Sequence, residues 1–311
     1  MPDIMVVLAC LSQCVPPTPR RQLGRVIEAM LSISGRVTMK GLSRWSGKGG
    51  SYRTIQRLFN TPLNWLQLNW LLIRHHLWDG DEVALMSGDH VVVTKAGKHT
   101  YGLDRFFSSL YGKPIPGLAF FAFSLVSVHA RRAFPVRVEP VVRSEAEKAA
   151  SKAQAAAKQQ KPSTPVRRPG RPKGSRSQPH AAVPLTPAWS RLTARLEALL
   201  NLSAGVIPLT YLVLDGHFGH HNALHMARQS RLHLISTLRC DAALSFPYAG
   251  PYAGRGPRRQ YGSQVDDGNM QATYLKETTV EGPIQTRVYQ APLLHKAFAQ
   301  PLNVVIITKR N

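Results

Sequence analysis

The chain has 311 residues, 43% of them hydrophobic, so it is long enough to bury a core and too apolar for a disordered protein. Forty Lys and Arg residues against 17 Asp and Glu residues give a net charge of +23 and a pI near 10.6. This excess favours a polyanionic partner, above all nucleic acid, over a neutral ligand. A basic surface without a partner is the alternative.

Compartment and membrane signals are few. Cys10, Cys14 and Cys240 form no pair of CxxC motifs, and a reducing interior is their simplest context. The longest apolar run, residues 117–128, is too short to span a bilayer. Asp3 stands where a signal peptide would carry positive charge. We therefore predict an intracellular protein without a membrane segment.

Residues 1–80 predict a helical DNA-binding region. One helix around residues 21–31 and a second over 38–45 precede the glycine-rich breaker 46–50, and a third begins at Ser51 and ends near Asn60. Helix, turn and short basic helix is the order of a helix-turn-helix. Lys48, Arg53 and Arg57 would then contact phosphates or base edges. An ordinary helical bundle packed on the main domain is the alternative.

Residues 81–311 predict a second domain, in which strands come first. The expected strands cover 83–93, 117–128, 133–142, 207–214 and 232–238, with helices over 189–202 and 220–231. This order predicts an α/β layer with a mixed sheet flanked by helices.

Two acids end short apolar runs that we interpret as buried strands. Asp89 ends the run 83–89, and Asp215 ends the run 211–215. The end of a buried strand is where a side chain can leave the core for a cleft. Two such carboxylates on adjacent strands could hold Mg²⁺ through hard oxygen ligands. The alternative for each is capping of a strand end or a place in a surface turn.

Basic segments accompany these strands. Residues 143–187 predict a basic flexible arm, which begins as an Ala/Lys/Gln stretch that could be helical. Within it, Arg168 and Lys173 flank a Gly-Arg-Pro core that contains Arg171 and resembles an AT-hook, a peptide that enters the minor groove of A·T-rich DNA. A basic linker without a defined binding mode is the alternative.

Further basic side chains lie near the first acid and late in the chain. Lys95 and Lys98 follow Asp89 and could clamp a phosphate, or could be solvated turn lysines. Residues 241–300 predict a β-rich insertion. It contains a second basic turn with Arg255, Arg258 and Arg259, and a strand over 302–308 follows it. This basic turn has the same two interpretations as the arm: a peptide that contacts DNA, or a basic linker without a defined binding mode.

Three histidines, His217, His221 and His225, have the spacing i, i+4, i+8, so one helix would align them. That spacing permits zinc ligation and hence a zinc hydrolase, although no Glu accompanies the pair as it does in metalloprotease helices. We favour two other interpretations: histidines on a helix face near a DNA groove, or histidines that are simply exposed.

In their order along the chain, four blocks resemble the DDE-type transposases of bacterial insertion sequences, in the branch with a late β-rich insertion. The blocks are SGDHVVVTKAGKHT at 87–100, LDGHFG at 214–219, LRCDAAL at 238–244 and GRGPRRQYG at 254–262. The resemblance implies a ribonuclease H-like core with an Asp on the first strand, an Asp on the fourth and a Glu on a later helix. Asp89 and Asp215 would be the first two catalytic and metal-binding acids.

What the resemblance implies for function is metal-dependent DNA strand cleavage and transfer at transposon ends. Two Mg²⁺ or Mn²⁺ ions would activate the attacking oxygen and stabilise the leaving oxygen. The partners would be transposon-end and target DNA, bound by a homodimer, in the nucleoid of a bacterial cytoplasm.

The third acid departs from this pattern. The only later glutamates, Glu277 and Glu281, fall in the expected β-rich insertion. The family's Glu would be expected on a helix beyond the C-terminus, after a strand such as 304–307. We therefore expect a C-terminally truncated enzyme that is inactive alone. A non-catalytic DNA-binding protein derived from a transposase is the alternative.

Overall fold

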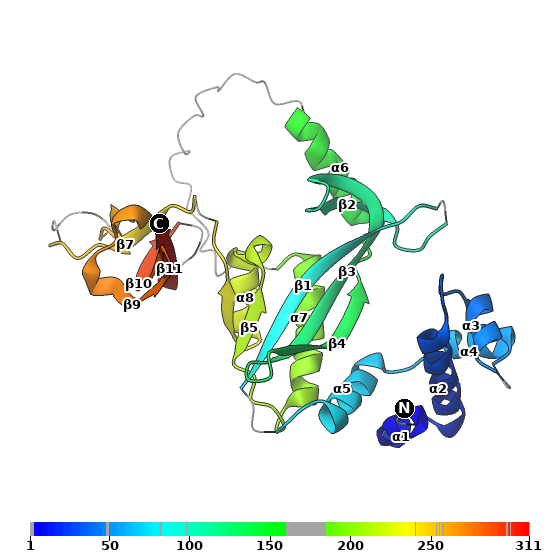
Figure 1. Cartoon of the computed structure of the whole chain (residues 1–311). Coiled ribbons are helices and arrows are strands. Elements are labelled where there is room, and N and C mark those ends of the chain that lie inside the picture. The colour runs from blue at the N-terminus through cyan, green and yellow to red at the C-terminus, as the bar shows by residue number, and fades with distance from the viewer. Residues whose placement is uncertain are drawn as a thin grey trace. The chain divides into compact units, whose positions relative to one another are not determined.

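A computed structural model gives the arrangement of the helices and strands (Figure 1). The structure describes residues 3–47, 50–80, 83–97, 99–159, 185–239, 241–252, 254, 256, 258–296, 298 and 300–310. The chain forms two compact units. The first comprises Met1–Pro165 and Ala194–Val213, and the second comprises Val166–Thr193 and Leu214–Asn311.

The first unit begins with short helices, as the sequence predicts. Their bounds are α1 Ile4–Val7, the 3₁₀ helix η1 Leu8–Gln13, α2 Pro17–Ser32, α3 Met39–Trp45, α4 Tyr52–Asn60 and α5 Trp65–His76. Helix α2 contributes to two cores. With η1 and α5 it buries Leu8, Leu11, Leu23, Leu68 and Leu71. With α3 and α4 it buries Val26, Ala29, Leu42, Ile55 and Leu58.

The main sheet contains six strands. These are β1 Ala84–Thr94, β2 Asp104–Ser108, β3 Lys113–Ser127, β4 Arg132–Pro140, β5 Tyr211–Leu214 and β6 His233–Ser236. The hydrogen-bonded order is β2-β3-β1-β5-β6, and β4 also pairs with β3. The predicted mixed α/β architecture is therefore confirmed.

Strand β3 organises one half of this sheet. It is antiparallel to β1, β2 and β4. Gly117 pairs with Thr94 of β1 and with Asp104 of β2, so these two strands lie on opposite edges of β3. Residues 120–127 likewise pair with both β1 and β4. Strands β2 and β4 therefore follow one another along one edge, and β1 occupies the other.

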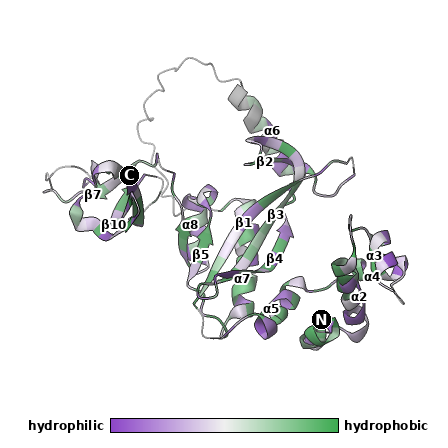
Figure 2. Ribbon diagram, viewed as in Figure 1, coloured by the Kyte–Doolittle hydropathy of each residue, from purple (hydrophilic) through white to green (hydrophobic). Residues whose placement is uncertain are grey.

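The side chains of β3 alternate between two faces of the main sheet, and helices cover the more buried face. Ala119, Phe121, Phe123 and Leu125 are buried, and the residues between them are half-buried. Figure 2 shows the hydrophobic residues that run through β3 and β5. Helices α5 and α7 Pro187–Ser203 contact β4 through polar groups. The Asn69 amide donates to the Val136 carbonyl at 3.0 Å, and Arg195 forms a 2.7 Å ion pair with Glu139.

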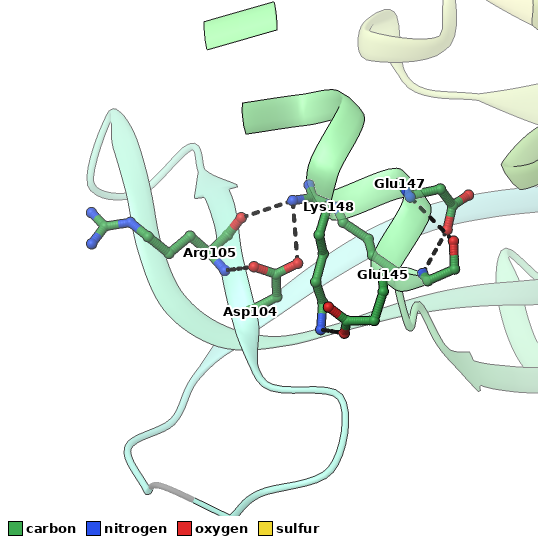
Figure 3. Close-up of polar contacts among 7 residues, drawn as sticks. Asp104, Arg105, Glu145, Glu147 and Lys148 are labelled. Atoms are coloured by element: carbon green, nitrogen blue, oxygen red, sulfur yellow. Dashed lines mark hydrogen bonds and ion pairs between the residues drawn. The ribbon is translucent and has the colours of Figure 1, made fainter. Parts of the chain in front are cut away.

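Helix α6 Glu145–Gln159 begins at a polar anchor on β2 (Figure 3). The Arg143 guanidinium pairs with Asp104 at 3.5 Å and lies 4.7 Å from the centre of the Phe106 ring. A capping box follows, because Ser144 N donates to Glu147 Oε2 at 2.8 Å and Glu147 N donates to Ser144 Oγ at 3.2 Å. The Ala/Lys/Gln stretch is thus helical, and residues 160–184 of the predicted arm lie outside the described residues.

The second unit contains a smaller antiparallel sheet. Its strands are β7 Leu244–Pro247, β8 Tyr261–Gln264, β9 Leu275–Glu281, β10 Ile284–His295 and β11 Leu302–Arg310. The order is β11-β10-β7-β8, and β9 pairs with β10. Short 3₁₀ turns, η4 Asp267–Asn269 and η5 Ala272–Tyr274, precede β9. The predicted antiparallel β-structure and the predicted final strand are confirmed.

In the part of the chain that the structure describes, none of the helices combines the length and hydrophobicity needed to cross a membrane.

Because Gly117 lies where β3 pairs on both sides, a side chain there should destabilise the first unit. A Cβ at this position would be 2.6 Å from the Val93 carbonyl oxygen, which is backbone and cannot move freely. We expect Gly117→Ala to lower the free energy of unfolding by about 1–3 kcal/mol. Gly80→Ala is the matched control, since its Cβ would meet nothing within 4 Å. Urea unfolding curves should separate the two variants, and equal midpoints would contradict the pairing described here.

Candidate active site

Asp89 lies in the middle of a strand. It is the sixth of eleven residues in β1, and pairing with β3 continues from Asp89–Ala122 to Thr94–Gly117. The prediction that Asp89 ends its strand is therefore wrong. The reason is that the β-branched residues 91–93 continue the extended pairing. What changes at Asp89 is burial, because Gly88 is buried and Asp89 is exposed.

Small groups surround Asp89 on its face of the sheet. Alternation places it on the face of Ser87, and its cross-strand partner is Ala122. The Ser87 hydroxyl is engaged, since it donates to the Ser124 carbonyl at 3.3 Å. Asp89 Oδ1 accepts from the backbone N–H of His90 at 2.6 Å. The carboxylate is thus oriented by its own strand and remains open to solvent.

Asp215 directly follows β5, as predicted, and is exposed. Its side chain caps the 3₁₀ helix η3 Gly216–Phe218, because Oδ1 accepts from the His217 N–H at 3.0 Å. Its carbonyl oxygen accepts from the Ser236 hydroxyl at 2.8 Å. One of the two carboxylate oxygens of Asp215 therefore serves as a cap, which is the alternative role that the sequence left open.

Two glycines let the Asp215 loop lie against the residue that follows β6. A Cβ on Gly216 would be 2.5 Å from Thr237 Oγ1, and one on Gly219 would be 2.5 Å from the Thr237 carbonyl oxygen. Any larger residue would push the loop away from Thr237. The sequence Asp-Gly-His-Phe-Gly thus fixes where the Asp215 carboxylate stands relative to β6.

The chain itself limits the distance between Asp215 and β5. Residues Tyr211 to Val213 of β5 belong to the first unit, in which β5 neighbours β1. Asp215 is two residues beyond Val213, so their Cα atoms are at most about 7 Å apart. Both predicted acids are therefore attached to neighbouring strands, Asp89 on β1 and Asp215 just past β5.

The predicted row of histidines is not on one helix. Helix α8 is His221–Gln229, whereas His217 belongs to η3. The rings of His221 and His225 stack with their centres 6.1 Å apart. Among the residues that the structure describes, no group of three or more His, Cys, Asp or Glu side chains could hold a metal ion. The zinc interpretation has no ligand set there.

The two predicted basic positions on α4 lie on its exposed face, whereas Lys95 is farther from Asp89 than expected. Arg53, Arg57 and Lys95 are all exposed. Because β1 stays extended to Thr94, Lys95 is about 20 Å along the strand from Asp89. Lys95 therefore does not lie beside this acid, and its contact with a phosphate stays a prediction.

In the late basic turn, Arg258 and Arg259 differ. Arg258 is exposed. The Arg259 guanidinium lies 4.9 Å from the centre of the Tyr248 ring, and its Nε donates to the Tyr261 carbonyl at 2.9 Å. Arg259 thus braces its own loop. The remaining predicted basic residues, Lys48, Lys98, Arg168, Arg171, Lys173 and Arg255, lie outside the described residues.

Glu277 and Glu281 lie on β9 of the second sheet, where the sequence predicted them. Every residue of β9 is exposed, and neither glutamate is on a helix.

Gln56 and Asn60 were not identified from the sequence as exposed polar residues of α4, and Gly216 and Gly219 were not identified as residues that pack closely against Thr237. Gln56 and Asn60 could have been found from their positions three and seven residues after Arg53 on the same helix.

Comparison with known proteins gives one match. The model of a protein family described as DDE superfamily endonuclease matches residues 10–291. This range includes both acids, the α2–α4 helices and most of the second sheet. A search of curated proteins found no match.

A half-buried histidine beside the Asp215 loop, His220, should make stability depend on pH. Burial, followed by the nearby His217 and His221, lowers the pKa of His220 below its ordinary value of 6.5. As pH falls below 6.5, the unfolded chain therefore binds more protons at His220 than the folded chain does. The folded state loses stability in that range. We expect His220→Asn to reduce the difference between the urea midpoints at pH 7.5 and pH 5.5.

His129→Asn, on the exposed turn between β3 and β4, is the matched control for this measurement. Identical pH dependence in the two variants would contradict a role for His220.

Proposed function

Since the chain belongs to the family of DDE superfamily endonucleases, we propose that it acts as a DNA transposase with Asp89 and Asp215 as metal-binding acids. Membership makes it a transposase-like nuclease with a ribonuclease H-like α/β fold and DNA as its substrate, and such nucleases generally use divalent metal ions. The resemblance drawn from the four sequence blocks is confirmed at this level. Strand cleavage and transfer at the ends of an insertion sequence is the finer activity that we propose.

The placement of the two acids on neighbouring strands carries this proposal. Asp89 lies on β1, the first strand, and Asp215 follows β5, which neighbours β1. Strand β2 pairs only with the first five residues of β3. If the short strand β2 is left out, β5 is the fourth strand in chain order. Asp89 then lies on the first strand and Asp215 directly follows the fourth, which supports the roles that the resemblance implies.

The carboxylates have the chemistry that a hard cation requires. Both are exposed, and among the described residues each accepts one hydrogen bond, at Oδ1. Each Oδ2 could therefore bind Mg²⁺ or Mn²⁺, and two ions are proposed for the intact site. When bound, the ions would activate the attacking hydroxyl and neutralise the leaving oxygen. The chain's contribution is to hold Asp89 on a paired strand and Asp215 on the capped turn.

The incompleteness of the site belongs to the same proposal. Glu277 and Glu281 are exposed on β9 of the second sheet, so we do not propose them as ligands. With two acids, the chain should bind metal and DNA, while cleavage should require a third carboxylate. A non-catalytic DNA-binding protein is the second candidate, because the cap that Asp215 provides for η3 would suffice as its role.

Metal binding distinguishes these candidates, and Asp266 offers a matched control. It caps η4 as Asp215 caps η3, with Oδ1 accepting from Gly268 N at 3.0 Å. Asn caps helices as well as Asp does, so Asp→Asn preserves each cap. We expect Asp89→Asn and Asp215→Asn, but not Asp266→Asn, to weaken Mn²⁺ binding at least tenfold in calorimetry.

A chain that binds Mn²⁺ equally well in all three variants would instead be the non-catalytic protein. Nicking of supercoiled plasmid, measured alongside, should be absent in the parent chain as in the variants. Robust nicking that depends on Glu277 or Glu281 would overturn the proposed incompleteness.

Two copies of the chain, each with a basic turn between β7 and β8, are proposed to assemble on the DNA. The exposed Arg258 should contact a phosphate. Arg258→Ala should therefore reduce the slope of log Kd against log salt by about 0.9 and weaken all sequences alike. Arg259→Ala is the comparison, because loss of its contact with Tyr248 should also lower stability. Filter binding at several salt concentrations tests this, and an unchanged slope would remove Arg258 from the interface.

A further inference from the structure

Helix α4 has one buried and one outward face. Ile55 and Leu58 are buried in the core that α4 shares with α2 and α3. At 100° per residue, the direction opposite these two side chains is that of Arg53 and Asn60, with Gln56 and Arg57 on either side. All four are exposed. The outward face of α4 thus consists of side chains that can donate or accept hydrogen bonds.

The turn before α4 fixes how this face is presented. Gly47 has φ +60°, a conformation that favours glycine, and a Cβ on Gly50 would be 1.7 Å from Ser46 Oγ. The Ser46 hydroxyl donates to the Gly50 carbonyl at 2.9 Å. Ser51 then caps α4, since its Oγ accepts from Thr54 N at 3.3 Å. The orientation of α4 against α3 is therefore specified by the turn sequence.

The charge around α4 indicates its partner. Residues 29–78 contain no Asp or Glu, and they contain seven basic residues: Arg36, Lys40, Arg44, Lys48, Arg53, Arg57 and Arg74. A segment of 50 residues without an acid is complementary to a polyanion along its whole length. An acidic protein could satisfy the charge, but it would not require the Gln and Asn side chains on the same face. Those groups match the major-groove edge of adenine.

One flank of the same face is apolar. Tyr52 is 48% exposed and Phe59 is 51% exposed, and both lie on the side of Gln56. An aromatic side chain beside a hydrogen-bonding face can contact the methyl group of thymine. The other flank carries Arg57, whose guanidinium could bind a backbone phosphate. A helix of nine residues is about 14 Å long and can cover about four base pairs.

We propose that α4 lies in the major groove of duplex DNA and reads its sequence. Gln56 and Asn60 would bind adenines, Arg53 would bind a guanine, Tyr52 and Phe59 would contact thymine methyl groups, and Arg57 would hold a phosphate. This deepens the proposed transposase function by assigning sequence recognition to this helix. Binding of this kind needs no metal ion and no acid of the catalytic site.

The test begins with the full chain in EDTA and a pool of random duplexes. Selection should enrich a site in which A·T pairs lie beside a guanine. Gln56→Ala and Asn60→Ala should each weaken binding to that site about 5- to 150-fold and relax the preference for one adenine. Gln13→Ala, an exposed glutamine of η1, is the matched control and should bind as the parent chain does. Arg57→Ala should weaken binding to the selected duplex and to scrambled duplexes by the same factor. Any loss of binding in Arg36→Ala should also be the same for the two kinds of duplex.

Base analogues test the groove directly. 7-Deazaadenine lacks the N7 acceptor, so it should weaken the parent chain but not the variant that has lost the matching side chain. Deoxyuridine in place of the thymine that Phe59 contacts should weaken binding by the parent chain but not by Phe59→Ala.

Failure to enrich any sequence, or full sensitivity to 7-deazaadenine in both Gln56→Ala and Asn60→Ala, would overturn the proposal. Because the selection is made in EDTA, without metal ions, this failure is distinct from failure of the metal site. Circular dichroism of each variant excludes loss of the helices as the cause.

Discussion

The pairing of β1 with its two neighbours is the constraint on which the proposed active site depends. On one side β1 is held by eleven consecutive antiparallel pairs with β3, and on the other side lies β5. These pairs fix which face of the sheet Asp89 occupies, since a slip by one residue would turn its side chain toward the buried face. The short chain from Val213 then keeps Asp215 close to the end of β5. Two acids 126 positions apart in the sequence are thereby attached to adjacent strands.

Local hydrogen bonds give each carboxylate a direction without burying it. Asp89 is held by the N–H of the next residue in its strand, and Asp215 by the N–H of His217 in the turn that it caps. Both arrangements leave an oxygen facing solvent. If the two carboxylates meet at one site, as we propose, they would repel one another, and a bound cation would relieve that repulsion.

The sequence predicted most elements because their signals are local. The cap at Ser51 and the strand that ends just before Asp215 depend on neighbouring residues, and the structure contains both. The strand expected over 83–93 agrees with β1. Placing Asp89 at a strand end was wrong because an acid within an apolar run looks like its end, whereas Val91 to Val93 continue the pairing with β3. Lys95 is therefore farther from Asp89 along the strand than expected.

Other features depend on three-dimensional contacts that the sequence does not show. The histidine spacing predicted a single row only if one helix contained all three residues, but Asp215 caps a separate turn before α8 begins. The bracing of Arg259 by Tyr248 depends on the fold of the loop, and a sequence shows only that both residues are near one another. The recognition face of α4 was visible in part, since Arg53 and Arg57 were identified from charge. Gln56 and Asn60 became visible once Ile55 and Leu58 defined the buried side.

The most direct measurement of the central claim is the anomalous diffraction of Mn²⁺ in crystals of the chain bound to a DNA duplex. The account predicts a manganese peak within about 2–2.3 Å of a carboxylate oxygen from both Asp89 and Asp215. Manganese bound elsewhere, or at one of these acids alone with the other directed away, would contradict it.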